Sequence, residues 1–412
     1  MEYVDNVMNL VRENLGCQPC SAKIFKDNFK NWTSGNKDID EFIQHSQLNA
    51  LHYKKFLEWV PFEKFQNITY VAEGGFGKIY SAKWSEGHIK YWDIDNQKCF
   101  LNEIKSHLQI HLFDVVQCFG VTQNPNTKEY MMIIKYCENG NLRNYLSKSE
   151  KYIDYGSKIS KLQQIARGLL DIHIAGKVHK DFIQVMYYLQ KLPYISDLGM
   201  CQPANKQTIK EEGIYGVLPY MAPEVLREHQ YTKAADIYSF GIIMNEFLSE
   251  EIPYNDIPHD EFLAIKICKG YRPTISKDIP NSLADLIIRC WDVEIENRPT
   301  TRELYQTLGK YYSESYDENS EIYLQIKESD EIGRKKFKSK SNEDKFKSIQ
   351  THPQAVYTSR LLNFESLPKP VNSSSFQLNS DANYAIQSTL ANPISECLDV
   401  QLNELDGENT IE

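Results

Sequence analysis

The sequence predicts an α+β fold in which a strand-rich part precedes a helix-rich part. Residues 68–80 alternate between apolar and polar side chains, turn on glycines and alternate again, a pattern typical of two antiparallel strands. Residues 131–137 are a short apolar run of the kind found in buried strands. Farther along, residues 159–173 place apolar side chains at helical spacing before Gly176. Because strands come first and helices later, the two kinds of element are segregated, which indicates the α+β class.

The composition indicates a chain with a large core and argues against nucleic acid as the main partner. The 412 residues are 41% hydrophobic and 12% aromatic, and the formal net charge is -10. A nucleic-acid-binding domain usually carries a basic surface, so the acidic balance argues against nucleic acid as a partner. The nine cysteines follow no disulfide-like spacing, and no apolar run approaches the roughly 18 residues of a membrane span. We therefore expect a cytoplasmic protein without a membrane span.

The chain divides into three parts. Residues 1–64 form a leader that we expect to be partly helical, because Ile39 and Ile43 lie one helical turn apart. Residues 65–312 form the main domain. Residues 313–412 are polar, and from Pro353 onward Asn, Ser, Gln and Pro dominate while apolar residues are too sparse for a core. Such a composition predicts a largely disordered tail.

Three short motifs lie between residues 178 and 224 of the main domain. Val178 to Asp181 reads Val-His-Lys-Asp, Asp197 to Gly199 reads Asp-Leu-Gly, and Ala222 to Glu224 reads Ala-Pro-Glu. In this order they resemble the catalytic loop, the metal loop and the end of the activation segment of a protein kinase. The chain is similar to kinases of the tyrosine-kinase-like group, including families expanded in some fungi. The resemblance implies a bilobal kinase fold with a small β-rich N-lobe and a larger helical C-lobe, and it implies ATP and Mg as cofactors.

Within these motifs the resemblance implies catalytic and metal-binding roles. Asp181 matches the base that accepts the proton of the substrate hydroxyl, and Asp197 matches a magnesium ligand. Lys180 stands beside the base in place of the usual arginine, and its single ammonium cannot make the bidentate grip of a guanidinium. Glu103 matches the glutamate that pairs with the lysine of strand three. The predicted catalytic residues are therefore Asp181, Lys180 and Glu103, and the predicted metal ligand is Asp197.

Two further positions are expected to be structural. Glu224 should form a buried ion pair with Arg298, since both occupy the positions that carry this pair in kinases. Asp236 should brace the backbone of the catalytic loop from the start of a central helix.

The resemblance places the nucleotide between a glycine-rich loop and a hinge. Glycine lets the loop backbone approach phosphates without an intervening side chain, and such a loop covers ATP in kinases. After residues 131–137 the chain would turn into a hinge whose backbone hydrogen-bonds adenine. Lys90 is the nearest substitute for the strand-three lysine. The residues predicted to bind the nucleotide are Gly74, Gly75, Gly77, Ile79, Lys90, Ile134, Tyr136 and Cys137.

Two departures from the family pattern bear on activity. No V-A-x-K sequence precedes Glu103, and the short interval between Gly77 and Glu103 leaves open whether strand three is present. The position five residues after Asp181, where kinases carry a magnesium-binding asparagine, is Met186. A thioether is a poor ligand for a hard cation that prefers oxygen.

The segment around Met186 also fits a shifted reading frame. One permitted coding of Ile183 to Tyr188 is ATT CAG GTA ATG TAT TAT, and a single C in front converts it to codons for His-Ser-Gly-Asn-Val-Leu. That string would restore an asparagine five residues after Asp181. We hypothesise that the segment carries such a shift, from a mis-assigned intron or from a lesion in the gene.

The sequence therefore supports three functional hypotheses. The first is a protein kinase that transfers the γ-phosphoryl of ATP to Ser, Thr or Tyr hydroxyls of protein substrates in signalling. The second is a pseudokinase that scaffolds partner proteins without turnover. The third is an incomplete gene model of an active kinase. Phosphoryl transfer depends on positioning and charge neutralisation, so loss of the lysine and of the second metal ligand predicts impaired catalysis for the chain as written.

Overall fold

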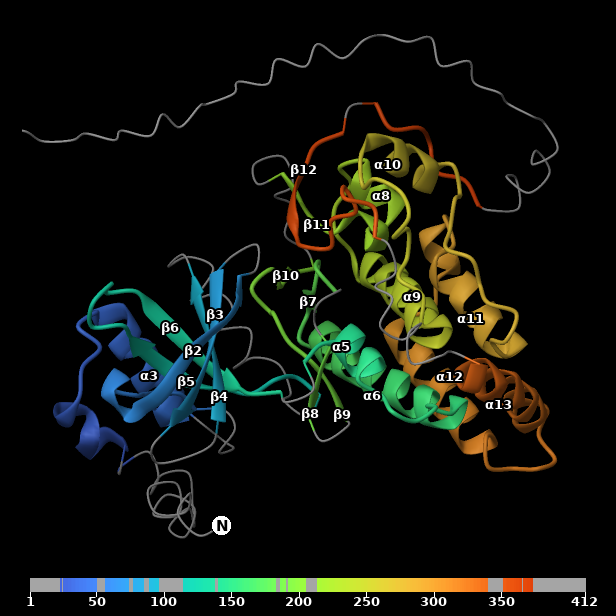
Figure 1. The fold of residues 1–412 in the computed structure, drawn as a ribbon. Coiled ribbons are helices and arrows are strands. Elements are labelled where there is room, and N and C mark those ends of the chain that lie inside the picture. The colour runs from blue at the N-terminus through green and yellow to red at the C-terminus, as the bar shows by residue number, and fades with distance from the viewer. Residues whose placement is uncertain are drawn as a thin grey trace, which may run out of the picture.

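The structure, a computed structural model, has a small lobe and a large lobe (Figure 1). It describes residues 23, 25–49, 56–73, 77–84, 89–95, 114–137, 140–182, 186–189, 192–204, 213–339, 351–364 and 366–372. Strands dominate the small lobe, drawn in blue to teal, and helices dominate the large lobe, drawn in green to red. The α+β class and the bilobal arrangement are confirmed.

A six-stranded sheet forms the small lobe. Its strand order is β1-β5-β6-β4-β3-β2, and every neighbouring pair is antiparallel except β1 with β5. The bounds are β1 Glu58–Trp59, β2 Phe65–Glu73, β3 Gly77–Trp84, β4 Ile89–Asp95, β5 Cys118–Gln123 and β6 Tyr130–Lys135. Short 3-10 turns occur at η1 (Phe29–Asn31) and η3 (Phe62–Lys64). Because β2 ends just before the glycine-rich segment and β3 begins just after it, that segment connects two paired strands.

β4 occupies the position of strand three, whose presence the sequence left open. Its backbone pairs with β3 on one side, where Ala82 lies opposite Lys90, and with β6 on the other, where Lys90 lies opposite Lys135. The strand opens Ile-Lys-Tyr-Trp, and aromatic and β-branched residues favour a strand. The third strand is therefore present even though its V-A-x-K signature is not.

A helix from the leader contributes to the core of the small lobe. α3 (Lys37–Asn49) buries Ile39 and Ile43 in a cluster with Leu57, Val121 and Met132. Since Val121 lies on β5 and Met132 on β6, the helix covers this end of the sheet.

Helices make up most of the large lobe. Their bounds are α5 Leu142–Ser147, α6 Tyr155–Ile174, α8 Pro223–Leu226, α9 Lys233–Ser249, α10 Glu261–Cys268, α11 Asn281–Cys290, α12 Thr301–Glu314 and α13 Glu321–Ser339, with 3-10 turns η4 Leu218–Tyr220 and η5 Ile295–Asn297. Short strands pair as β7 (Lys177–Val178) with β10 (Gln202–Pro203), β8 (Met186–Leu189) with β9 (Leu192–Ile195), and β11 (Ile214–Gly216) with β12 (Arg360–Leu362). Of the helices in the described ranges, none is both long and apolar enough to cross a membrane.

α9 is the central helix of this lobe. Every residue from Ala235 to Leu248 is buried, which is the behaviour of a helix that is surrounded by protein on all sides. α6 and α11 pack against it, and the resulting core carries the loops of the candidate site at one end.

Two segments beyond residue 312 belong to the fold, in contrast to the expectation of a largely disordered tail over residues 313–412. The first is α13, which buries Ile322 and Ile326 in the core of the large lobe. These two residues lie one helical turn apart on a single face, so a helix that is polar overall still has an apolar side to bury.

The second segment runs from residue 351 to residue 372. It contains β12, and it packs Leu362 into the core of the large lobe, where that side chain is 6% exposed. Figure 1 shows this red segment beside β11. The remainder of the expected tail, residues 340–350 and 373–412, lies outside the described residues.

Candidate active site

The backbone of the catalytic loop is fixed by one buried carboxylate. Asp236, in the first turn of α9, accepts the N–H of His179 at 2.8 Å and the N–H of Lys180 at 3.0 Å. His173, at the end of α6, contacts the same carboxylate at 2.9 Å from Nε2. The predicted bracing role of Asp236 is confirmed. Lys180 adopts a left-handed φ of 72°, a conformation that persists only where the surroundings hold it.

Asp181 is a buried carboxyl with an unusually high pKa. Burial, with a smaller contribution from the negative charge of nearby Asp197, raises its pKa to about 7. Within the described residues its Oδ1 atom is buried without a hydrogen-bond partner of good geometry. A buried oxygen without a hydrogen bond lowers the stability of the folded state. A carboxyl in such a position is therefore a candidate functional group. A pKa near neutrality suits a general base.

Asp197 follows β9 and lies half-buried beside the catalytic loop. Its φ is 54°, in the left-handed region. Burial raises its pKa, while the nearby His179 and the backbone N–H of Gly199 act in the opposite direction. A bound cation would favour the ionised form of Asp197, and carboxylate oxygen is the donor that magnesium prefers.

The described residues supply this site with few metal ligands. They contain no group of three or more His, Cys, Asp or Glu residues arranged to hold a metal ion. Asp197 would hold a magnesium ion through its carboxylate, and magnesium in phosphoryl-transfer sites commonly takes its remaining oxygens from phosphates and water.

Two neighbouring side chains hold the ammonium of Lys180. Its ammonium donates to Oε1 of Gln202 on β10 and lies 5.0 Å from the centre of the Tyr231 ring. Gln202 pairs with Val178 across the short β7–β10 ladder, so the ladder positions the partner of Lys180.

Aromatic rings pack together at the catalytic loop. The ring of His179 meets Phe182 edge-on at 5.4 Å, and Phe182 stacks on Phe240 of α9 at 6.1 Å. Burial lowers the pKa of His179, which favours the neutral imidazole. The Nε2 atom of His179 donates to the carbonyl of Ser196 at 3.2 Å, which ties the catalytic loop to the chain leading into Asp197.

The predicted ion pair of Glu224 with Arg298 is confirmed. Both guanidinium nitrogens are engaged, Nη1 to Oε1 at 2.6 Å and Nη2 to Oε2 at 2.8 Å. The Arg298 side chain is 0% exposed and that of Glu224 is 9% exposed. Arg298 also donates to the carbonyl of Ala234, so its charge is fully partnered.

The predicted nucleotide residues are only partly within the described chain. Ile79 lies half-buried in β3, Ile134 half-buried in β6, and Tyr136 and Cys137 follow β6. Burial raises the pKa of the Cys137 thiol to about 12, so it stays protonated.

The other predicted nucleotide and catalytic positions lack a described side chain. For Gly77 and Lys90 the structure describes only the backbone, at the start of β3 and within β4. Gly74, Gly75 and Glu103 lie outside the described residues. Their roles stay predictions.

Met186 begins β8, where its backbone pairs with Ile195. The position expected to carry a metal-binding asparagine is therefore the first residue of a hairpin between the catalytic loop and Asp197. Residues 183–185 lie outside the described part of the chain.

Sequence reasoning did not single out two residues that organise the site. His173 bridges Asp236 and the hydroxyl of Thr301 on α12, and Gln202 holds Lys180. His173 lies near the end of a helix whose other buried positions are mostly apolar, apart from Lys158 near its start, so an ionisable residue at the buried end of the helix is the signal that could have found it. No comparable signal marks Gln202.

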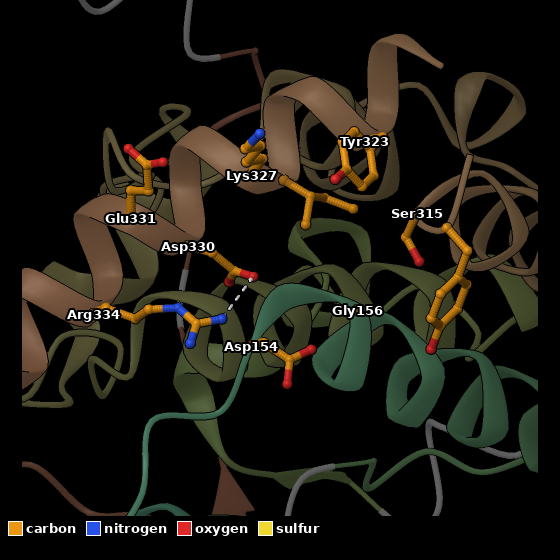
Figure 2. Close-up of a pocket in the computed structure, with 10 residues that line it drawn as sticks. Asp154, Gly156, Ser315, Tyr323, Lys327, Asp330, Glu331 and Arg334 are labelled. Carbon is orange, nitrogen blue, oxygen red and sulfur yellow. Dashed lines mark ion pairs between the residues drawn. The ribbon is translucent and has the colours of Figure 1, made fainter. Parts of the chain in front are cut away.

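A pocket of about 280 Å³ lies elsewhere on the large lobe, between the start of α6 and α13. Figure 2 shows Asp154, Asp330 and Arg334 among the residues that line the pocket, and Asp330 and Arg334 form an ion pair of 3.8 Å on α13. α6 has 20 residues and is therefore about 30 Å long, and the catalytic loop follows its far end. This pocket is separate from the candidate active site.

Comparison with known families decides the identity of the domain. The family model for protein tyrosine and serine/threonine kinases matches residues 65–308, more than half of the chain. The chain belongs to this family. The kinase domain found by comparison ends within α12, close to the expected boundary at residue 312.

Similar kinases come from several organisms. The RGS domain-containing serine/threonine-protein kinase A of Dictyostelium discoideum is 27% identical over 240 residues, which are 56% of this chain and 21% of that protein. The serine/threonine-protein kinase VIK of Arabidopsis thaliana is 28% identical over 267 residues, 60% of each chain. The tyrosine-protein kinase SPK-1 of Girardia tigrina is 26% identical over 281 residues, 61% of this chain and 56% of that protein. The chain thus spans between a fifth and three fifths of these relatives.

Proposed function

We propose that the chain transfers the γ-phosphoryl of ATP to a hydroxyl of a protein substrate, with Asp181 as general base and Asp197 as magnesium ligand. The observation that carries the proposal is Asp181 itself. Its backbone neighbours are fixed by Asp236, its pKa is raised to about 7, and its Oδ1 atom is buried without a partner of good geometry in the described chain. Such a carboxyl is suited to accept a proton at neutral pH.

The contacts of Lys180 bear on how the proposed kinase activity is regulated. Its ammonium contacts Gln202 and the Tyr231 ring. In the proposed kinase these contacts take the place of the bidentate grip that an arginine would exert on a phosphorylated activation segment. We propose that activity here does not require that phosphorylation.

We further propose that the protein acts in the cytoplasm. The cysteines at positions 118, 137, 201, 268 and 290 are buried, and among the described residues they form no disulfide. Buried cysteines that are not joined in disulfides support a reducing compartment.

The experiment is phosphoryl transfer by the purified chain with labelled ATP and magnesium. We expect label on the chain or on added protein, and we expect Asp181→Asn to abolish it, because an amide cannot accept the proton. Glu318→Gln, at an exposed helix-linker position, is the matched control and should retain activity. Label that persists in Asp181→Asn would overturn the assigned base.

A pseudokinase is the second candidate, favoured by Met186 at the position of the metal-binding asparagine. It predicts no transfer in any variant, together with nucleotide binding that is weak or independent of magnesium. Thermal unfolding with ATP, with and without magnesium, measures that binding, since a ligand of the native state raises Tm.

The reading-frame hypothesis is tested at the transcript. A read across codons 77 to 200 that restores an asparagine codon five places after Asp181 supports an incomplete gene model. A transcript that encodes Met186 there overturns that hypothesis.

A further inference from the structure

The segment from residue 351 to residue 364 lies along the part of the large lobe that leads into the Ala-Pro-Glu motif. β12 pairs antiparallel with β11, with Ile214 opposite Leu362 and Gly216 opposite Arg360. β11 ends seven residues before the helical turn that contains Glu224. This stretch resembles the loop that positions peptide substrates in kinases. An added strand is a common way for a protein to bind an extended peptide, because main-chain hydrogen bonds supply affinity and side-chain pockets supply specificity.

Side chains within β12 and upstream of it anchor the segment. Leu362 is buried in the core of the large lobe, and Nη2 of Arg360 donates to the carbonyl of His259 at 2.6 Å. Upstream, the Tyr357 hydroxyl donates to the carbonyl of Pro253 at 2.7 Å, and the Arg143 guanidinium lies 4.1 Å from the centre of the Tyr357 ring.

The loop between α9 and α10 holds the first half of the segment. The N–H of His259 donates to the carbonyl of Gln354 at 3.0 Å, and Nδ1 of its ring contacts the carbonyl of Val356 at 2.9 Å. The N–H of His352 donates to the carbonyl of Asn255 at 2.7 Å. The segment is therefore fixed before, at and after Tyr357.

Ser359 lies between these anchors, directly before β12. Its Oγ atom is buried and, within the described chain, has no hydrogen-bond partner of good geometry, and the same is true of Oδ1 of Asp181. The Ser359 hydroxyl nevertheless lies against the Asp181 carboxyl closely enough to lower its pKa, opposing the larger effect of burial. The docked segment thus brings together Oγ of Ser359 and Oδ1 of Asp181, a hydroxyl donor and a carboxylate acceptor.

We propose that residues 351–364 occupy the peptide-substrate site of their own kinase domain, with Ser359 in the position of the phosphoacceptor. The proposal rests on the proposed kinase function for its chemistry. The register supports it, because the strand contacts hold the residues after the acceptor while the contacts to His259 and Pro253 hold the residues before it. The docked segment also covers the site against other protein substrates.

The reaction in the docked state follows from the proposed activity. Oγ of Ser359 attacks the γ-phosphorus of ATP, an oxygen–phosphorus bond forms, and the bond from that phosphorus to the β–γ bridging oxygen breaks. The hydroxyl proton passes to Asp181, and ADP leaves with the bond's electron pair. The product is phosphoserine at position 359.

Docking is tested without any catalysis, by amide hydrogen exchange of the full chain. Leu362→Asp places a charge in the core and should release the segment, so that amides of residues 214–216 and 360–362 exchange more than about tenfold faster than in the wild type. Leu361→Asp is the matched control, because Leu361 is the neighbouring residue of the same strand and is 55% exposed. Equal exchange in all three proteins would overturn the proposal.

A milder variant guards against misfolding of Leu362→Asp. Arg360→Ala removes the hydrogen bond to His259 and buries no charge. It should accelerate exchange of the same amides to a smaller extent. Unchanged exchange in both Arg360→Ala and a folded Leu362→Asp would likewise overturn docking.

The acceptor is tested by mapping phosphate after incubation of the full chain with ATP and magnesium. We expect phosphate on Ser359, at a rate independent of protein concentration, because the acceptor and the base belong to one molecule. Ser359→Ala should remove it, and Thr358→Ala, at the exposed neighbouring residue, should not. Phosphate elsewhere in segment 351–364 but not on Ser359 would overturn the assignment.

The two proposals fail in different ways. A synthetic peptide of residues 351–364 is offered to Leu362→Asp, whose own segment is released. If other proteins are labelled but Ser359 is labelled neither in the chain nor in the peptide, the inference is overturned and the kinase function stands. Slow exchange of the docked strand with no transfer to any acceptor overturns the kinase function, and the docked segment stands as an unreactive occupant of the site.

Discussion

At the scale of single residues, the position of Asp181 in the candidate active site lowers the stability of the folded chain. Its pKa is raised from 3.8 to about 7, first by burial and then by the charge of Asp197. The folded chain therefore binds a proton that the unfolded chain releases, so stability falls as pH rises from about 4 to about 7. The shift corresponds to roughly 4 kcal/mol of lost stability above pH 7.

We expect Asp181→Asn to raise Tm relative to the wild type at pH 8, in the absence of nucleotide and metal, because the amide cannot ionise. The gain should shrink as the pH falls from 7 toward 4, because the folded wild-type carboxyl is then protonated, and below about pH 4 it is protonated in both states. Thermal unfolding of the two proteins across this range is the measurement, with the exposed Glu318→Gln as control. A difference in Tm that does not vary with pH would contradict the raised pKa of Asp181.

Glu224 illustrates the opposite case, a charge that is fully partnered. Glu224→Gln leaves the guanidinium of Arg298 buried and without its counter-ion, and breaking a buried pair in this way typically costs about 3–5 kcal/mol. We expect a fall in Tm of several degrees at pH 7. Glu251→Gln, at an exposed residue, should change Tm little. Equal melting of the two variants would show that the pair contributes nothing to stability.

The sequence predicted some of these residue contacts and not others, for a physical reason. Glu224, Arg298 and Asp236 lie in short motifs whose spacing along the chain carries the contact. His173 and Gln202 act through partners that only the folded chain brings near, and no local pattern encodes such a partner.

At the scale of elements, α12 shows how a local signal sets a boundary. Thr300 and Glu303 form a capping box, in which the N–H of Glu303 donates to the Thr300 hydroxyl at 3.3 Å and the N–H of Thr300 donates to the Glu303 carboxylate at 2.8 Å. The helix buries Leu304 and Leu308 against the core and packs along α6. Its start therefore affects the whole large lobe.

We expect Thr300→Ala to destabilise the protein by about 1 kcal/mol, because the N–H of Glu303 loses its hydroxyl acceptor and the Glu303 carboxylate loses a hydroxyl donor. The matching fall in Tm is roughly 2–4 °C for a domain of this size. Thr358→Ala removes an exposed hydroxyl and serves as the control. A Tm for Thr300→Ala equal to that of the control would mean that water replaces the cap without cost.

Elements were predictable from sequence where periodicity was local. The hairpin around the glycine-rich segment and α6 follow from alternation and helical spacing. β4 was left open because the expectation relied on a lysine signature, whereas a strand requires only side chains that fit a sheet and neighbours with which to pair. α13 was not predicted, because its composition is mostly polar and only the positions of Ile322 and Ile326 on one face indicate a packed helix.

At the scale of the whole molecule, the two lobes follow from the order of the motifs, but the docking of residues 351–364 does not. Each of its contacts joins residues about a hundred or more positions apart, as in the hydrogen bond from Arg360 to His259 and the pairing of Leu362 with Ile214. Separation along the chain hides such contacts from any reading of local pattern. The segment nevertheless determines whether another protein can reach Asp181.

A segment tethered to its own site is present at a high effective concentration, on the order of millimolar for a flexible linker. It therefore competes with any added substrate, and the apparent KM for that substrate is raised in proportion to the docking equilibrium. We expect Leu362→Asp to lower the KM for the synthetic peptide of residues 351–364 by tenfold or more, with kcat little changed, because release frees the site and leaves the catalytic loop intact. Initial rates over a range of peptide concentrations measure both constants.

Two controls separate occupancy from other effects of the substitution. Leu361→Asp adds the same charge at an exposed position and should keep the high KM of the wild type. Ser359→Ala keeps the anchors of the segment and removes only its acceptor, so it should remain inhibited although it cannot be phosphorylated at that site. If Ser359→Ala were as active toward the peptide as Leu362→Asp, the inhibition would depend on the acceptor hydroxyl and not on the strand. A docked strand predicts the reverse, because its affinity comes from β11, His259 and the core around Leu362.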